Sequence, residues 1–152
     1  MTSLKTFLTC AAASACLMAF VVPAAAPTNN TETLAAAAKE PGAKVTTSGL
    51  VIRMLKEGNG AQPAATSTVK VHYKGTFPDG KEFDSSFKRG EPIEFPLTGV
   101  IKCWTEGVAL MKVGGTAKLT CPSSIAYGAR GAGGVIPPNA TLVFEVTLLG
   151  VR

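Results

Sequence analysis

The chain has 152 residues, a formal net charge of +5, 46% hydrophobic residues and 16% charged residues. This length is typical of one small domain with a short extension. The basic residues are scattered, which argues against nucleic-acid binding. The sequence holds one histidine and no cluster of His, Cys and carboxylate residues, so we expect neither a metal nor a cofactor.

The first 24 residues are predicted to be a signal peptide. Lys5 precedes an apolar stretch that ends in small residues, and Val22 and Ala24 occupy the positions typical of a cleavage site after Ala24. A transmembrane anchor, which needs about 20 apolar residues, and lipid attachment at Cys16 are alternatives. The apolar stretch is rich in Ala, lacks a basic flank on its far side and continues past Cys16. We therefore expect an exported protein, periplasmic or secreted.

Residues 25–47 are predicted to be a flexible linker. They are mostly Thr, Asn, Ala, Glu, Pro and Gly, with almost no large apolar side chain. Such a composition buries too little surface to offset the entropy lost on ordering.

The pattern changes near residue 49 to that of a folded domain, residues 48–152. Residues 69–74 alternate apolar and polar side chains, as a half-buried strand does, with His72 on the solvated face. Further strands are expected at 50–55, near Phe83, and at 93–97, 116–121 and 141–149. One helix is predicted near 102–112, where Trp104 and Val108 share a face. This order predicts an α+β domain, a twisted antiparallel sheet curled around one short helix.

Two cysteines, Cys103 and Cys121, follow the predicted signal peptide. Cys103 begins the predicted helix, and Cys121 shares the inward-facing phase of its strand with Leu119. Because exported proteins can hold disulfides, one hypothesis is a bond that ties the helix to the sheet. It requires Cα atoms within about 7 Å. The alternative is two buried free thiols.

A set of aromatic and branched residues occurs in a characteristic order along the domain. The motifs are Val71-His72-Tyr73-x-Gly75, Asp79-Gly80-x-x-Phe83-Asp84-Ser85-Ser86, Gly99-Val100-Ile101-x-x-Trp104-x-Glu106-Gly107, Ala126-Tyr127-Gly128 and Ile136-Pro137-Pro138-Asn139-Ala140-Thr141-Leu142-x-Phe144-x-Val146. Each motif alone is unspecific, and any one residue could simply belong to a core. Together, in this order and spacing, they resemble the FKBP family of prolyl isomerases, and most of all its exported bacterial, Mip-like members.

The resemblance implies an apolar pocket between helix and sheet, with Trp104 at its floor. Asp84 corresponds to the family's pocket carboxylate, with Arg89 placed to pair with it. Tyr127 would offer its hydroxyl to a substrate carbonyl, and Phe83 would be a catalytic wall residue. The remaining substrate-binding residues implied by position are Tyr73, Ile93, Phe95, Val100, Ile101, Ile136 and Phe144. Three positions depart from the family pattern: Cys103 replaces a glycine, Ile93 an aromatic residue, and Ala132 a larger polar residue.

The implied function is peptidyl-prolyl cis/trans isomerisation of X-Pro bonds, which needs no cofactor. Proline-containing peptides and unfolded exported proteins are the expected partners, and macrolides such as rapamycin the expected inhibitors. A monomer is expected, because the long helical segment that dimerises some Mip-like proteins is absent.

Two other classes of function remain open. One is a chaperone or binding module without turnover, and the other is an inert exported domain, which would leave the polar groups of Tyr73, Asp84 and Tyr127 unexplained.

Overall fold

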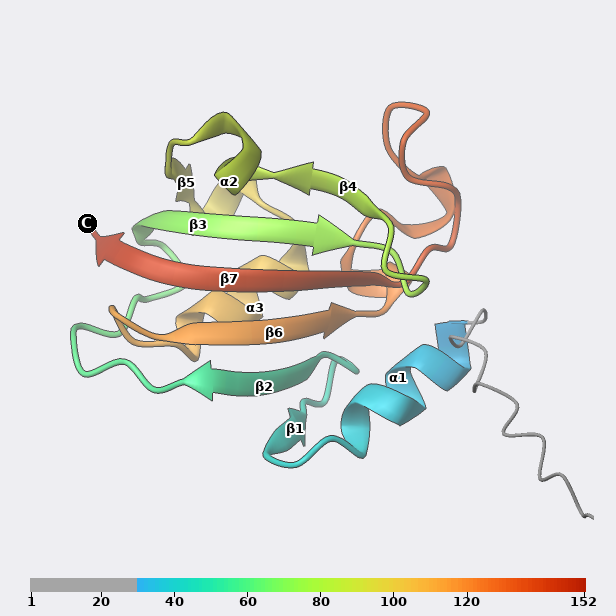
Figure 1. The fold of residues 1–152 in the computed structure, drawn as a ribbon, viewed down its shortest axis with the longest axis horizontal. Helices are drawn as coiled ribbons and strands as arrows, with labels where there is room; N and C mark the ends of the chain where they lie inside the picture. Colours follow the sequence, from blue (N-terminus) through green and yellow to red (C-terminus); the bar gives the residue numbers. More distant parts are fainter. Residues whose placement is uncertain (1–29) are drawn as a thin grey trace, which may run out of the picture.

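The computed structural model describes residues 30–152, so the predicted signal peptide lies outside the described residues. In this part of the chain, seven strands form one antiparallel sheet in the order β1-β2-β6-β7-β3-β4, with β5 also paired to β3 (Figure 1). The strands are β1 (Ala43–Val45), β2 (Val51–Lys56), β3 (Thr68–Thr76), β4 (Glu82–Ser85), β5 (Ile93–Pro96), β6 (Thr116–Cys121) and β7 (Leu142–Val151). Helix α3 (Lys102–Ala109) lies across one face.

The core lies between α3 and the central strands β6, β7 and β3. On β6, Ala117, Leu119 and Cys121 are fully buried, so every second residue points inward. Helix and strand approach closely at Gly107, where a Cβ atom would lie only 2.8 Å from a methyl carbon of Leu119. A larger residue at Gly107 would therefore displace the Leu119 side chain in this contact between α3 and β6. The α+β architecture and the strands predicted from the alternating pattern are confirmed.

Within residues 30–152, the structure has two α-helices beside the predicted one, α1 (Asn30–Ala38) and the four-residue α2. Helix α2 (Ser86–Arg89) begins after Ser85, whose hydroxyl accepts the Phe87 N–H, and ends at Gly90 in a left-handed conformation (φ 73°). Four residues are too few to display helical periodicity, so sequence patterns could not predict α2. The predicted helix itself, α3, ends at Ala109, earlier than expected, and Met111 beyond it is fully buried.

The segment before the domain differs from the flexible linker expected at 25–47. Residues 30–38 form helix α1 (Asn30–Ala38), and β1 pairs with β2, while residues 25–29 lie outside the described part. Helix α1 buries Thr33 and Ala37, and Glu40 binds both Arg53 (2.9 Å) and Lys118 (2.6 Å). Small side chains and ion pairs therefore hold this segment against the sheet, in place of the large apolar residues whose absence suggested a linker.

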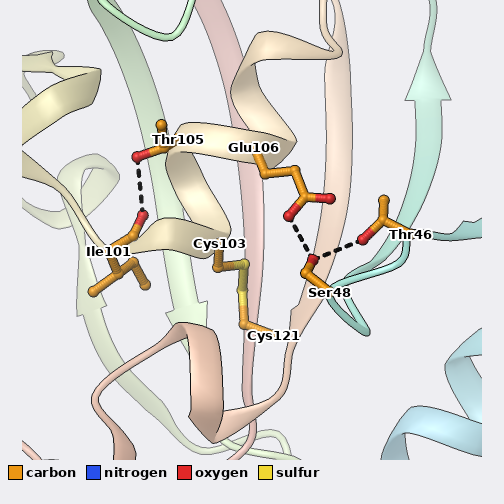
Figure 2. The surroundings of a disulfide bond; sticks show 7 residues. All are labelled: Thr46, Ser48, Ile101, Cys103, Thr105, Glu106 and Cys121. Carbon is orange, nitrogen blue, oxygen red and sulfur yellow. Dashed lines mark hydrogen bonds between the residues drawn. A yellow bond between two sulfur atoms is a disulfide. The ribbon is translucent and has the colours of Figure 1, made fainter.

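A disulfide joins the start of α3 to the end of β6 (Figure 2). The Cα atoms of Cys103 and Cys121 lie 5.8 Å apart, and both side chains are fully buried. This geometry agrees with the hypothesis of a helix-to-sheet disulfide and not with two free thiols. A second tie to the helix comes from Ser48, whose hydroxyl donates to Glu106 at 2.5 Å. The helix is thus fastened covalently beside Trp104.

Candidate active site

A cavity of about 270 Å³ opens between α3 and the sheet. Most of its lining is aromatic or aliphatic, with one carboxylate and two phenol hydroxyls. The lining residues are Tyr73, Phe83, Asp84, Phe95, Gly99, Val100, Ile101, Trp104, Tyr127 and Phe144. They come from four strands, one helix and two loops, so the cavity exists only in the folded chain.

Trp104 is held at the base of the cavity by three other rings. Its ring centroid lies 5.1 Å from that of Tyr73, and 5.5 Å from those of Phe95 and Phe144. All three pairs are close to perpendicular, at 83–89°, a favourable arrangement for aromatic quadrupoles. Only 4% of Trp104 is exposed. The indole orientation is therefore fixed by packing.

The wall formed by Phe83 depends on a glycine in the neighbouring strand. A Cβ atom at Gly75 on β3 would lie 2.6 Å from the Phe83 ring. The Phe83 ring also meets Phe144 at 5.6 Å between centroids, almost perpendicularly. A 3₁₀ turn η1 (Leu97–Gly99) leads into Val100, another lining residue. Gly75 and Gly99 were not predicted as site residues, although both fall within the quoted motifs.

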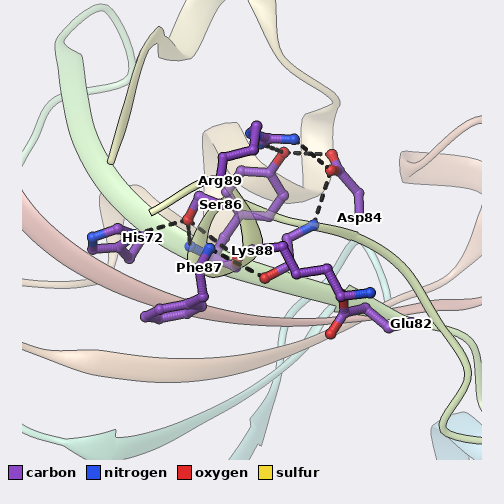
Figure 3. A network of polar contacts seen from close by, with 9 residues as sticks. His72, Glu82, Asp84, Ser86, Phe87, Lys88 and Arg89 are labelled. Atoms are coloured by element: carbon purple, nitrogen blue, oxygen red, sulfur yellow. Dashed lines mark hydrogen bonds and ion pairs between the residues drawn. The ribbon is translucent and has the colours of Figure 1, made fainter. Parts of the chain in front are cut away.

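The carboxylate at the rim is bound by three neighbours (Figure 3). Tyr73 donates its hydroxyl hydrogen to Asp84 Oδ2 at 2.5 Å, and Arg89 Nη1 donates to Asp84 Oδ1 at 2.8 Å. Arg89 Nη2 also donates to the Tyr73 hydroxyl at 3.0 Å, and the N–H of Ser85 donates to Asp84 Oδ1 at 2.9 Å. Both carboxylate oxygens are therefore engaged by the protein.

These contacts determine which groups carry charge. Burial alone would raise the pKa of Asp84, but the hydrogen bonds from Tyr73 and Arg89 outweigh it, and the pKa lies below its usual value. Burial, together with the negative charge of Asp84, raises the pKa of Tyr127. Burial and the hydrogen bond to Asp84 likewise raise that of Tyr73. At neutral pH the site therefore holds one carboxylate and two neutral phenols.

Ser86, quoted in a motif in the sequence analysis without a role, has a buried hydroxyl that contacts the backbone of Tyr73. Ser86 is fully buried; its Oγ accepts the N–H of Tyr73 at 2.8 Å and lies 2.9 Å from His72 Nδ1. The expectation of a solvated His72 is wrong in part: the residue is half-buried and stacks on Phe87, with ring centroids 4.7 Å apart. The reason is α2, which carries Phe87 across the polar face of β3 (Figure 3).

Three of the predicted site residues, Ile93, Ile136 and Arg89, do not line the cavity. Ile93 and Ile136 pack with the hydrophobic core but do not line the cavity. Arg89 lies at the rim, where it binds Asp84 and Tyr73. Ala132 stands apart in the loop, paired with Ile136 through a backbone bridge. All other predicted floor, wall and polar residues line the cavity.

Within residues 30–152, no three His, Cys, Asp or Glu side chains gather where a metal ion would be held. The same residues include no helix with the length and apolar character required to cross a membrane.

The fold and cavity define a class: a small α+β domain that presents an apolar, aromatic slot with a polar rim. Comparison with known proteins specifies the class further. The sequence model described as FKBP-type peptidyl-prolyl cis-trans isomerase matches residues 59–149. The chain belongs to this family.

Two relatives and one solved structure show the extent of the similarity. FKBP-type peptidyl-prolyl cis-trans isomerase FkpA of Aeromonas hydrophila is 58% identical over 121 residues, which cover 80% of this chain and 45% of the relative. FK506-binding protein 1 of Dictyostelium discoideum is 59% identical over 103 residues, 66% of this chain and 96% of that protein. The crystal structure of Escherichia coli FkpA matches with a TM-score of 0.78 and 50% identity, over 81% of this chain and 57% of that one. This chain thus spans about half the length of the FkpA relatives.

Proposed function

We propose that this protein is a peptidyl-prolyl cis/trans isomerase that acts on X-Pro bonds in the apolar cavity. The observation that carries the proposal is the Trp104 indole, fixed by three rings at the base of a cavity of about 270 Å³. A flat, large, apolar surface suits the pyrrolidine ring of proline. Membership of the FKBP-type family supports the same activity.

The chemistry follows from the amide bond. Rotation about it meets a barrier of roughly 18–20 kcal/mol, because resonance gives the C–N bond double-bond character. The planar form is charge-separated and is favoured by water, whereas the twisted form has lost that charge separation. An apolar cavity therefore disfavours the planar imide relative to the twisted one, and each 1.4 kcal/mol or so of that difference raises the rate about tenfold.

The polar groups at the rim orient the substrate. The neutral Tyr127 hydroxyl, on a residue that is 38% exposed, donates a hydrogen bond to a substrate carbonyl. Asp84 acts electrostatically and structurally, because both its oxygens are engaged by Tyr73, Arg89 and Ser85. Since no proton is transferred, Asp84 does not need a pKa near neutrality.

The biological setting extends the proposal. The apolar N-terminal 24 residues support cleavage and export to the periplasm or the medium, where unfolded proline-containing chains are the substrates. Rapamycin-like macrolides occupy the same cavity as inhibitors.

The direct test measures isomerisation of an X-Pro peptide with and without rapamycin. We expect catalysis above the uncatalysed rate, and inhibition as the macrolide saturates the cavity. Phe144→Leu alters the cavity lining, whereas Phe87→Leu changes a ring that is 54% exposed and lies outside the cavity. Phe144→Leu should lower kcat/KM several-fold per folded molecule, and Phe87→Leu should leave it unchanged. A folded protein that suppresses aggregation without accelerating isomerisation would contradict the proposal and indicate a chaperone.

A further inference from the structure

We propose that Asn30, the first residue of α1, is a positioning residue for the active-site loop, residues 126–141. The inference rests on the proposed function, because this loop carries Tyr127. The Asn30 carboxamide binds the end of the loop at two points. Its Oδ1 accepts the N–H of Thr141 at 3.0 Å, and its Nδ2 donates to the carbonyl of Asn139. More than a hundred residues of sequence separate the partners.

The contact continues through the backbone to the catalytic tyrosine. The N–H of Asn139 donates to the carbonyl of Gly128 at 2.9 Å, and Gly128 follows Tyr127 directly. Asn139 thus accepts a hydrogen bond from Asn30 with its carbonyl and donates one to Gly128 with its N–H. It has a left-handed φ of 57°, found at no other non-glycine residue within 30–152. An uncommon conformation of this kind persists where its surroundings hold it.

The far part of the loop is closed on itself. Ala132 and Ile136 exchange two backbone hydrogen bonds of 3.0 Å, and residues 133–135 between them are exposed. This turn does not fix where Tyr127 lies relative to the sheet. That position is set by the two chain segments at the base of the loop. The hydrogen bond from the Asn139 N–H to the Gly128 carbonyl joins these two segments.

The carboxamide itself is carried by an anchored element. Helix α1 buries Ala37, and Glu40 just beyond it binds Arg53 and Lys118 on β2 and β6. Figure 1 shows α1 beside the end of the sheet where β7 begins. Thr141, whose N–H meets Asn30, is 1% exposed. A buried backbone donor is nearly always paired in a native protein, so the loop base depends on this acceptor.

The test combines backbone amide exchange with isomerase kinetics on three full-length variants. In Asn30→Ala, exchange of the Thr141 and Asn139 amides should accelerate at least tenfold. kcat/KM should fall about threefold to tenfold. The size of this fall should differ between peptides with a small residue before proline and peptides with a large one. Asn30→Asp keeps the acceptor for the Thr141 N–H but loses the hydrogen bond to the Asn139 carbonyl. It should therefore restore slow exchange at Thr141. The Asn139 N–H, which donates to Gly128, should still exchange faster than in the wild type, because the Asn139 carbonyl is no longer held. Glu40→Gln is the matched control, because it weakens the other end of α1 without touching Asn30.

Glu40→Gln should leave exchange in residues 126–141 and the peptide preference as in the wild type. Equal acceleration in Glu40→Gln would overturn the proposal, because Asn30 would then act only through the stability of α1. Unchanged exchange in Asn30→Ala would overturn it as well. Amide exchange needs no turnover. An inactive wild type would therefore contradict the proposed function, whereas exchange lost in Asn30→Ala and restored at Thr141 in Asn30→Asp would still support the positioning role.

Discussion

The two sides of the cavity are built by different forces. On the side of α3 and the sheet, Trp104 is 4% exposed and held by three perpendicular ring contacts beside a disulfide. On the loop side, Tyr127 is 38% exposed, and the next residue, Gly128, accepts the N–H of Asn139 at the loop base. The packed side determines the shape of the slot, and the loop side carries the proposed donor, the Tyr127 hydroxyl. Substitutions on the two sides should therefore separate stability from turnover.

The largest expected effect is a loss of stability from a substitution in the core, next to the α3 side of the cavity. Leu119 is fully buried and packs against Gly107 of α3. Leu119→Ala should lower the free energy of unfolding by about 2–5 kcal/mol, because it leaves a cavity in the core. Chemical denaturation measures this loss. Activity per folded molecule should stay near the wild-type value, and a parallel loss of activity would show that the slot is not insulated from the core.

Removal of the disulfide should have the next largest effect. Cys103 and Cys121 are 18 residues apart in sequence, and their bond restricts the unfolded chain. Replacement of both by Ala should cost about 2–4 kcal/mol of stability. The double variant, measured by denaturation beside a reductant-treated wild type, should retain isomerase activity while folded. Equal stability of oxidised and reduced protein would contradict the tie between helix and sheet.

A substitution on the loop side should lower activity and leave stability nearly unchanged. Tyr127→Phe removes the proposed donor and leaves the packed rings untouched. kcat/KM should fall several-fold, equivalent to about 1 kcal/mol of transition-state stabilisation, with a melting temperature close to that of the wild type. Melting and isomerisation measured on the same sample provide the comparison. A variant with full activity would exclude the hydroxyl from the reaction.

The smallest effect is expected from pH. The pKa of Asp84 is lowered in the folded state, so its stabilising contribution is complete above the unfolded pKa of about 3.9 and is lost as pH falls through the folded value. Melting temperature should therefore decline only below about pH 4. kcat/KM should be nearly flat from about pH 6 to 8. A bell-shaped profile in that range would reveal a titrating catalytic group and contradict this account.

The sequence was most informative where a pattern repeats or a motif is long. The alternation along β3, β6 and β7 predicted strands, and the order of motifs placed Trp104, Phe83 and Asp84 in one cavity. Contacts between residues far apart in the sequence produce no such pattern and could not be predicted from one. The four-residue α2 has no period to detect, and the burial of His72 follows from that helix.

The N-terminal segment illustrates the same limit. Its composition suggested a linker because large apolar residues are absent. In the structure, Glu40 pairs with Arg53 and Lys118, and Asn30 binds the backbone near Thr141. Neither kind of contact is apparent from composition, because each depends on a partner that the fold brings close.

The central claim is that the aromatic residues enclose a working slot and are not merely a core. Phe83→Tyr tests it most directly, because the variant adds one hydroxyl to the apolar wall of the half-buried ring. The measurement is a melting curve and an X-Pro isomerisation rate on the same sample, beside Leu119→Ala. For Phe83→Tyr we predict a several-fold lower kcat/KM per folded molecule, beyond what any fall in melting temperature explains, because the para carbon of this ring also packs against Gly75. For Leu119→Ala we predict a lower melting temperature with near-normal activity per folded molecule. If activity instead follows the folded fraction in both variants, the aromatic residues are a core and the proposed slot does not exist.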